Sequence, residues 1–170
     1  MSQKTSPDHV KVAVVGASGY SGEELVKLLL LHPNVELTVL TSRQYAGHSL
    51  SEVFPRFSNL PDASTLQFSA PDCQTILDKA DLAFLALPHG VAAEFAVPLC
   101  EGGCQVIDLS ADFRIHDPVV YEEFYGAPHP APQLLGKSVY GLPERHRDQI
   151  KEAQLIASPG WYPTSILLPC

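Results

Sequence analysis

The sequence is poor in charge, has little basic character and lacks any apolar run long enough to cross a membrane. Of its 170 residues, 18% are charged and 45% are hydrophobic, a balance that excludes disorder and suits one globular domain. No apolar run approaches the ~20 residues that span a bilayer, and the N-terminal MSQKTSPDHV lacks a signal-peptide core. The net charge of −8 repels a nucleic-acid backbone. We therefore expect an acidic cytoplasmic protein with neither membrane nor nucleic acid as a partner.

Cysteine is also sparse, with four residues at Cys73, Cys100, Cys104 and Cys170. Cys100 and Cys104 have ligand-like spacing, but no second close Cys or His pair accompanies them. A chain of this length does not need disulfides for stability. We expect partly buried thiols and no bound metal.

Short β-branched runs alternate with helical patterns over residues 10–110. The apolar runs predict strands at 10–15, 35–42, 65–70, 81–88 and 104–110. Apolar spacing and capping residues predict helices at 23–32, 71–80 and 89–103. This alternation predicts an α/β fold with a doubly wound, mostly parallel, Rossmann-like sheet.

The pattern changes after Ser110. Residues 111–144 are rich in proline and glycine, so we expect no long regular element there. An aromatic-containing loop beside strand ends is more typical of a binding surface than of a linker. Further along, the sequence predicts a helix at 144–153, a strand at 155–160 and the start of a helix at 162–169.

A glycine-rich loop, GASGYSG at 16–22, joins the first predicted strand to the first predicted helix. Gly16 permits a tight turn, and Gly19 lets backbone N–H groups approach a pyrophosphate. Gly22 allows close packing of the helix, whose positive end faces the phosphates. An ordinary glycine-rich turn is the alternative, but the position after the first strand favours dinucleotide binding.

The end of the second predicted strand bears on the choice of cofactor. An NAD-selective site usually has Asp or Glu about twenty residues beyond the loop, to hold the ribose 2′-hydroxyl. Here Thr41, Ser42 and Arg43 occupy that place. A hydroxyl and a guanidinium suit a 2′-phosphate. The sequence favours NADP(H), with a solvated surface arginine as the alternative.

Two later segments follow predicted strands at the edge where ligands bind in such sheets. His89, within LPHG, either shapes a nicotinamide pocket or begins the next helix with its ring in solvent. Arg114 either binds an anionic substrate, oriented by Ser110 and Asp112, or forms a local Asp–Arg pair that closes the turn.

The segment SPGWYPT at 158–164 places a Pro-Gly turn before a helix start. That setting would stabilise a thiolate or an oxyanion on the first helical residue. The residue there is Trp161, which is neither a nucleophile nor an acid. Spacing alone favours a tryptophan that packs at a helix start.

Together these segments resemble the N-acetyl-gamma-glutamyl-phosphate reductases, relatives of aspartate-semialdehyde dehydrogenase. The resemblance is carried by GASGYSG at 16–22, TSRQYAG at 41–47, LALPHG at 85–90, LSADFR at 109–114, YGLPE at 140–144 and SPGWYPT at 158–164. It covers nearly the whole chain from Val10. It implies an NADP-dependent oxidoreductase of arginine biosynthesis, in which a cysteine attacks an acyl phosphate and the resulting thioester is reduced to an aldehyde. It also implies a small-molecule substrate and a homo-oligomeric full-length enzyme.

The resemblance assigns roles to individual residues. It places the cofactor against Gly16, Ser18, Gly19, Tyr20, Ser21, Gly22, Ser42, Arg43, Leu87, Pro88 and His89. It places Ser110 and Arg114 toward the substrate, and Trp161 at the position of the family's nucleophilic cysteine. Cys170 lies roughly 13 Å farther along a helix and cannot occupy that point.

The expected domains are a flexible tail at 1–9, an NADP-binding domain at 10–157 and the start of a truncated second, α+β domain at 158–170. With tryptophan at 161 and the second domain missing, we expect the chain as it stands to lack reductase activity. One alternative is a non-catalytic NADP-binding regulatory or interaction module in which Trp161 caps the nicotinamide pocket. Another is an aspartate-semialdehyde dehydrogenase-like enzyme that acts on a different acyl phosphate.

Overall fold

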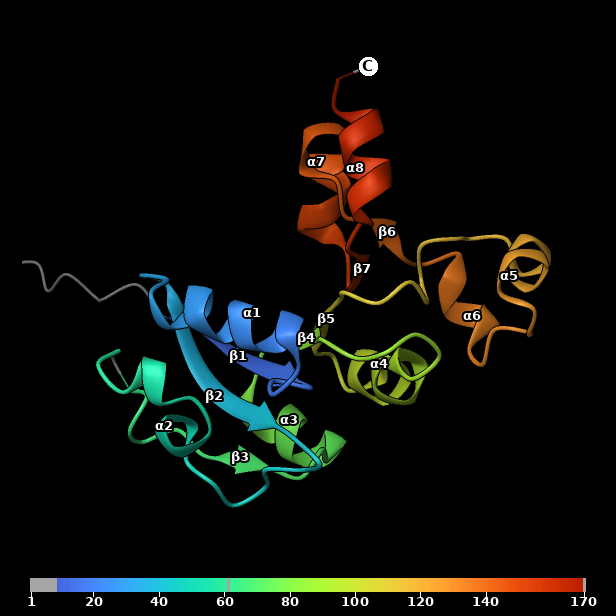
Figure 1. Cartoon of the computed structure of the whole chain (residues 1–170). Coiled ribbons are helices and arrows are strands. Elements are labelled where there is room, and N and C mark those ends of the chain that lie inside the picture. Colours follow the sequence, from blue (N-terminus) through green and yellow to red (C-terminus); the bar gives the residue numbers. More distant parts are fainter. Residues whose placement is uncertain (1–8, 61, 170) are drawn as a thin grey trace, which may run out of the picture. The chain divides into compact units, whose positions relative to one another are not determined.

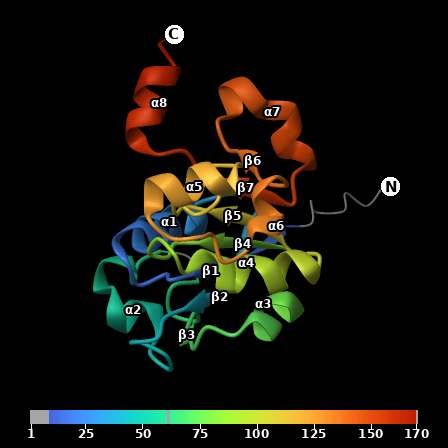
Figure 2. The same cartoon turned by 90° about the vertical axis from the view of Figure 1, so that its right-hand side faces the viewer.

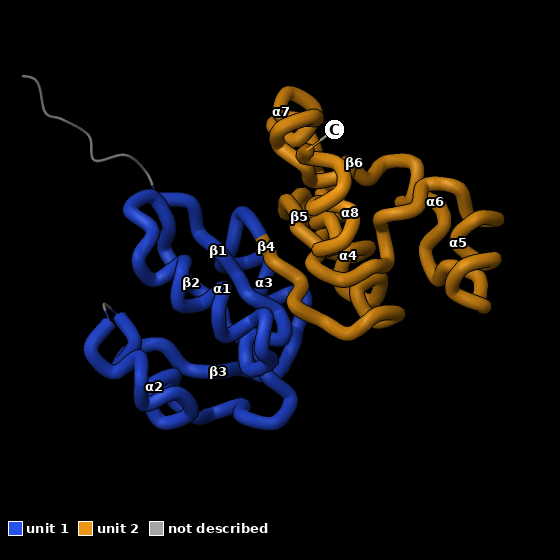
Figure 3. Tube along the Cα trace, turned by 45° about the horizontal axis from the view of Figure 1, so that its top comes forward, with its two compact units in different colours: residues 1–82 blue, residues 83–170 orange. Residues whose placement is uncertain are grey.

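A computed structural model describes residues 9–60 and 62–169, which fall into two compact units (Figure 3). The first unit extends to Leu82 and the second begins at Ala83. Apart from His9, the expected tail lies outside the described residues, and so does Cys170. Among the described helices, none combines the length and apolar character needed to cross a bilayer.

The first unit is built on parallel strands in the order β3-β2-β1. Its elements are β1 (Val10–Val15), α1 (Tyr20–Leu30), β2 (Val35–Thr41), α2 (Leu50–Val53), η1 (Pro55–Phe57), β3 (Phe68–Ser69) and α3 (Cys73–Lys79). Figure 1 shows α1 on one face of β1 and β2 and α3 on the other. Residues 12–15 of β1 are fully buried, as expected for a parallel strand covered on both sides.

The second unit carries strands in the order β4-β5-β7-β6, and the pairs β5–β7 and β7–β6 are parallel (Figure 2). Its elements are β4 (Leu82–Leu85, of which Leu82 is the last residue of the first unit), α4 (Ala92–Glu101), β5 (Gln105–Asp108), α5 (Pro118–Tyr125), α6 (Pro132–Leu135), β6 (Val139–Tyr140), α7 (Pro143–Glu152), β7 (Leu155–Ala157) and α8 (Trp161–Leu167). Parallel strands that alternate with helices confirm the predicted α/β, Rossmann-like class.

Two expectations about local structure need correction. The first helix begins at Tyr20, inside the glycine loop, and not at residue 23. Residues 111–144 hold the eight-residue helix α5, the short helix α6 and strand β6. Proline begins α5, where Asp117 caps the first turn by accepting hydrogen bonds from Val119 and Val120, and Gly126 (φ 74°) ends the helix. The residues interpreted as helix breakers therefore act as helix boundaries.

Candidate functional site

The glycine loop of the first unit packs tightly against the start of α1. Gly16 has φ 82°, a conformation that favours glycine. A Cβ on Gly22 would overlap the carbonyl oxygen of Gly16 and lie 2.8 Å from Cα of Ala17. A Cβ on Gly19 would meet only an ordinary contact, 3.6 Å from the Gly16 oxygen. Gly22 is thus required by the packing, whereas Gly19 leaves room on the outer side of the loop.

The first turn of α1 is suited to an anion. Its N-cap is Gly19, which offers no side chain to accept from the first-turn N–H groups. Gly19, Tyr20 and Ser21 are exposed, and Tyr20 is 96% exposed. A helix start of this kind, next to a glycine turn, can donate several N–H groups to a phosphate.

The last residue of β2, Thr41, and the residue after it, Ser42, hold this loop in place. The amide of Gly16 donates to Oγ1 of Thr41 (3.2 Å), and the amide of Ala17 donates to its carbonyl (3.0 Å). The hydroxyls of Ser18 and Ser42 lie 2.8 Å apart, and Oγ of Ser42 also accepts from the amide of Tyr45 (3.2 Å). Ser42 is buried, so its role in the structure is to anchor the loop.

Arg43 follows this buried serine and is exposed. Its guanidinium therefore lies at the surface, next in sequence to Ser42, which anchors the loop. A charged fork beside a phosphate-binding loop can bind a 2′-phosphate. The exposure of Arg43 agrees with the predicted role, which stays a prediction.

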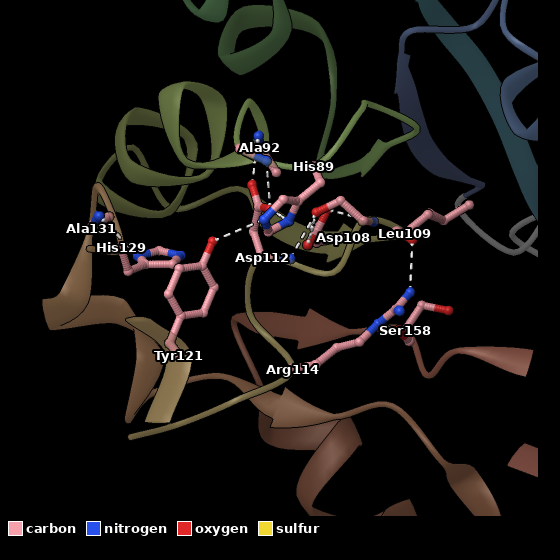
Figure 4. A network of polar contacts seen from close by, with 12 residues as sticks. His89, Ala92, Asp108, Leu109, Asp112, Arg114, Tyr121, His129, Ala131 and Ser158 are labelled. Carbon is pink, nitrogen blue, oxygen red and sulfur yellow. Dashed lines mark hydrogen bonds and ion pairs between the residues drawn. The ribbon is translucent and has the colours of Figure 1, made fainter. Parts of the chain in front are cut away.

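In the second unit, a buried carboxylate organises the loop after β4 (Figure 4). Asp112 is fully buried. Its Oδ1 accepts from the amide of Gly90 (2.7 Å) and lies 2.7 Å from Nδ1 of His89. Its Oδ2 accepts from the amide of Ala92 (3.0 Å), the first residue of α4. The sequence predicted that Asp112 orients Arg114; in the structure its carboxylate binds the His89 loop.

The imidazole of His89 is also held from its other side by α5. Tyr125 stacks on it with ring centroids 4.3 Å apart, and the Tyr121 hydroxyl lies 3.5 Å from Nε2. Burial raises the pKa of Tyr121 to about 12, so this phenol stays protonated and can donate a hydrogen bond to Nε2. Sequence reasoning missed both tyrosines, although their spacing of four residues on a capped helix marks one helix face.

Ser110, predicted to face the substrate, is engaged within the protein. Its hydroxyl donates to Oδ2 of Asp108 (2.7 Å) and accepts from the amide of Asp112 (3.1 Å). Asp108 is fully buried, and burial raises its pKa from 3.8 to about 6 against the lowering effect of the Ser110 hydrogen bonds. These bonds shape the turn after β5.

Arg114 braces the segment that leads into α8. Its Nε donates to the carbonyl of Ser158 (2.7 Å) and its Nη2 donates to the carbonyl of Leu109 (3.1 Å). A Cβ on Gly160 would lie 3.1 Å from Nη1 of this arginine. Trp161, the first residue of α8, is 92% exposed. Arg114 therefore joins the end of β5 to the turn before residue 161, and its predicted substrate role stays a prediction.

Two of the described cysteines, Cys73 and Cys100, lack the character of an activated nucleophile. Burial raises the pKa of Cys100, on α4, to about 11, and burial also raises the pKa of Cys73. Within the described part of the chain, no group of three or more His, Cys, Asp or Glu side chains is arranged to hold a metal ion.

The parallel strands, the glycine loop at the start of a helix and the Ser-Arg pair after β2 define the class of this protein as a dinucleotide-binding α/β protein. The family model described as "Semialdehyde dehydrogenase, NAD binding domain" matches residues 11–153. The chain belongs to this family, as its NAD-binding domain. The match confirms the predicted resemblance and the nicotinamide dinucleotide as the cofactor class.

Curated relatives match almost the whole chain. The N-acetyl-gamma-glutamyl-phosphate reductase of Akkermansia muciniphila is 58% identical over 161 residues, which is 94% of this chain and 46% of that protein. The [LysW]-L-2-aminoadipate/[LysW]-L-glutamate phosphate reductase of Saccharolobus solfataricus is 50% identical over 161 residues, with 95% and 45% covered. The chain spans less than half the length of these relatives.

Solved structures show the same fold at low sequence identity. Aspartate semialdehyde dehydrogenase II of Vibrio cholerae gives a TM-score of 0.61 at 19% identity, over 90% of this chain and 42% of that chain. Aspartate semialdehyde dehydrogenase of Candida albicans, solved with NADP, gives 0.53 at 20% identity, over 72% and 41%.

Proposed function

We propose that this chain is the NADPH-binding part of an N-acetyl-gamma-glutamyl-phosphate reductase, which reduces N-acetyl-glutamyl 5-phosphate to its semialdehyde in arginine biosynthesis. The observation that carries the proposal is the 58% identity to the Akkermansia reductase over 94% of the chain. The proposed reaction is assigned to a protein of the full length of this relative, since the chain spans only 46% of it.

The cofactor roles follow from the contacts in each unit. Exposed N–H groups at the start of α1 bind the pyrophosphate, with the loop held by the Ser18–Ser42 hydrogen bond. Arg43 pairs with the 2′-phosphate, and residues 87–89 lie at the nicotinamide. The residues proposed to bind the cofactor are Gly16, Ser18, Gly19, Tyr20, Ser21, Gly22, Ser42, Arg43, Leu87, Pro88 and His89.

NADPH, when bound, supplies the hydride that reduces the substrate carbonyl. The remaining chemistry needs a thiolate that displaces phosphate from the acyl phosphate. The residue proposed for that position is Trp161, which has no nucleophilic atom. Arg114 braces the turn before it and, with Ser110, faces the substrate. The chain as it stands binds the cofactor and has no reductase activity.

A second candidate substrate has its own support. The 50% identity to the Saccharolobus reductase supports a [LysW]-L-2-aminoadipate or [LysW]-L-glutamate phosphate as the substrate. Both candidates share one reaction class, the reduction of a phosphate of an acidic amino acid derivative. Assays of a complete protein with each acyl phosphate separate them.

Titration with NADPH tests the binding proposal directly. Trp161 is the single tryptophan and is 92% exposed, so we expect its fluorescence to change as NADPH binds, together with heat in calorimetry. The absence of both signals contradicts dinucleotide binding. For catalysis, we expect the chain extended to the length of its relatives to gain reductase activity only with Trp161→Cys. Activity with Trp161 retained contradicts the assigned position of the nucleophile.

Replacement of Arg43 tests the preference for the 2′-phosphate. We expect Arg43→Ala to weaken NADPH by roughly tenfold or more while changing NADH little, since a charge-assisted pair is lost. Arg145→Ala, an exposed arginine on α7, is the matched control and should change neither affinity. Equal losses for NADPH and NADH contradict the assignment.

A further inference from the structure

We propose that Asp112 is the positioning residue for the nicotinamide end of the cofactor, and that it acts by fixing the loop at residues 87–91 and the ring of His89. The inference rests on the proposed function, because that function places this loop at the nicotinamide. Asp112 itself touches neither cofactor nor substrate in this proposal.

The first support is the way in which α4 is capped. Its N-cap is Val91, whose side chain has no acceptor for the first-turn amides. Asp112, twenty residues away in sequence, provides the acceptor instead, with Oδ2 on the amide of Ala92. A carboxylate at a helix start also interacts favourably with the helix dipole. The turn after β5 therefore holds the loop after β4 in place.

The second support is the loop backbone. Gly90 has φ 85°, and its amide donates to Oδ1 of Asp112 at 2.7 Å. The same oxygen lies 2.7 Å from Nδ1 of His89. Three groups of residues 89–92 (the His89 ring, the Gly90 amide and the first helical amide) thus meet one fully buried carboxylate. Because a buried charge needs such partners, the loop has one favoured conformation.

The third support is the imidazole itself, which has contacts on three sides although the His89 side chain is 42% exposed. Asp112 accepts at Nδ1, Tyr121 lies at Nε2 and Tyr125 covers one ring face. With Tyr121 donating to Nε2, the neutral ring carries its proton on Nδ1. Packing alone would not specify the tautomer of an exposed histidine. A binding site benefits when the ring is already oriented before the ligand binds.

Two ligands separate the positioning role from a general effect on the fold. NADPH carries the nicotinamide, whereas 2′-phospho-ADP-ribose keeps the adenosine, the phosphates and the terminal ribose without it. We expect Asp112→Asn to weaken the binding of NADPH roughly tenfold and to leave that of 2′-phospho-ADP-ribose within about twofold. The amide has one acceptor oxygen: when this oxygen accepts from Ala92, the NH2 group faces the amide of Gly90 and Nδ1 of His89, which lose their acceptor. The matched control is Asp148→Asn on α7, whose side chain is 95% exposed and which should change neither affinity.

Nitrogen NMR of the His89 ring gives a second, independent result. In the unsubstituted chain we expect the proton of the neutral ring on Nδ1, and in Asp112→Asn we expect it to move to Nε2. A proton on Nε2 in the unsubstituted chain overturns the inference, and so does an equal loss of both ligands in folded Asp112→Asn.

If Asp112→Asn does not fold, His89→Phe replaces it. Phenylalanine keeps a ring against Tyr125 but has no donor for Asp112. The affinity for NADPH should therefore fall again, while that for 2′-phospho-ADP-ribose should not. Unchanged NADPH affinity in that variant overturns the inference. If the unsubstituted chain binds neither ligand, the proposed function itself fails, and the His89 spectrum still tests the contact with Asp112.

Discussion

The hydroxyl oxygens of Ser18 and Ser42 lie 2.8 Å apart, so one hydrogen bond joins the glycine loop after β1 to the residue that follows β2. Ser42 is 3% exposed, and its oxygen also accepts from the amide of Tyr45. We expect Ser42→Ala to lower the free energy of unfolding by about 1–3 kcal/mol, since it leaves polar groups unpaired. Urea denaturation measures this loss.

The partner variant isolates the pair. Ser18→Ala removes the same hydrogen bond but leaves the Ser42–Tyr45 contact, so it should cost less. In the double variant the two costs should not add, and the coupling should be about 1 kcal/mol. Strictly additive costs would show that the two hydroxyls do not interact in solution.

Sequence patterns predicted the strands and the helices α1, α3 and α4 of residues 10–110, because apolar runs and glycine turns are local signals, but they missed α2 and η1. The strand predicted at 65–70 is only Phe68–Ser69, because strand pairing, which sets strand length, depends on distant residues. The same reason explains the missed strand β6, which pairs with β7 from a segment rich in proline. Proline marked the first turn of α5 there, and the cap Asp117 was the available signal.

The candidate site divides in the same way. The glycine loop could be located from sequence, since its residues are contiguous and both Gly16 and Gly22 have a steric reason to be glycine. The role of Asp112 could not, because its partners Gly90 and Ala92 are more than a helical turn away in sequence and meet it only through the fold. Ser110 and Arg114 were recognised as a polar cluster, but their bonds to Asp108 and to backbone carbonyls depend on the tertiary structure.

Two glycines of the loop should respond differently to the same substitution. Gly22→Ala should destabilise the fold by about 1–3 kcal/mol or more, because the new Cβ overlaps the backbone at Gly16 and Ala17. Gly19→Ala adds a Cβ at 3.6 Å from the Gly16 oxygen and should leave the fold intact, while it weakens NADPH by obstructing the pyrophosphate. Thermal unfolding and NADPH titration of both variants check this. Unchanged NADPH affinity in Gly19→Ala would remove that residue from the proposed site.

The buried carboxyl of Asp108 should make stability depend on pH. Its pKa is raised from 3.8 to about 6, so the folded chain binds the proton more tightly than the unfolded chain. Its stabilising contribution is therefore fully present below pH 3.8 and is lost as the pH rises through about 6. The loss corresponds to about 3 kcal/mol at most.

Asp108→Asn removes this titration. The unfolding free energy of the variant, relative to that of the unsubstituted chain, should rise between pH 3.8 and 6. Urea denaturation across this range measures the difference, with Asp148→Asn as the exposed control. A difference that is constant with pH would mean that Asp108 ionises as easily in the folded chain as in the unfolded one.

Arg114 should stabilise the turn before α8 even in the absence of substrate. Its Nε and Nη2 donate in different directions, to the carbonyls of Ser158 and Leu109. A lysine ammonium cannot reproduce this fork, so Arg114→Lys should lower the unfolding free energy by about 1–3 kcal/mol. Amide exchange at Ser158, which donates to the carbonyl of Asp108, should also become faster.

The matched control is Arg147→Lys on the exposed side of α7, which should change neither quantity. Gly160→Ala approaches the same contact from the other side, because its Cβ would lie 3.1 Å from Nη1 of Arg114 and must displace the guanidinium. If bracing is the role of Arg114, both Arg114→Lys and Gly160→Ala accelerate exchange at Ser158. If Arg114→Lys leaves stability and exchange unchanged, the guanidinium is not needed by the turn and its role is confined to the substrate.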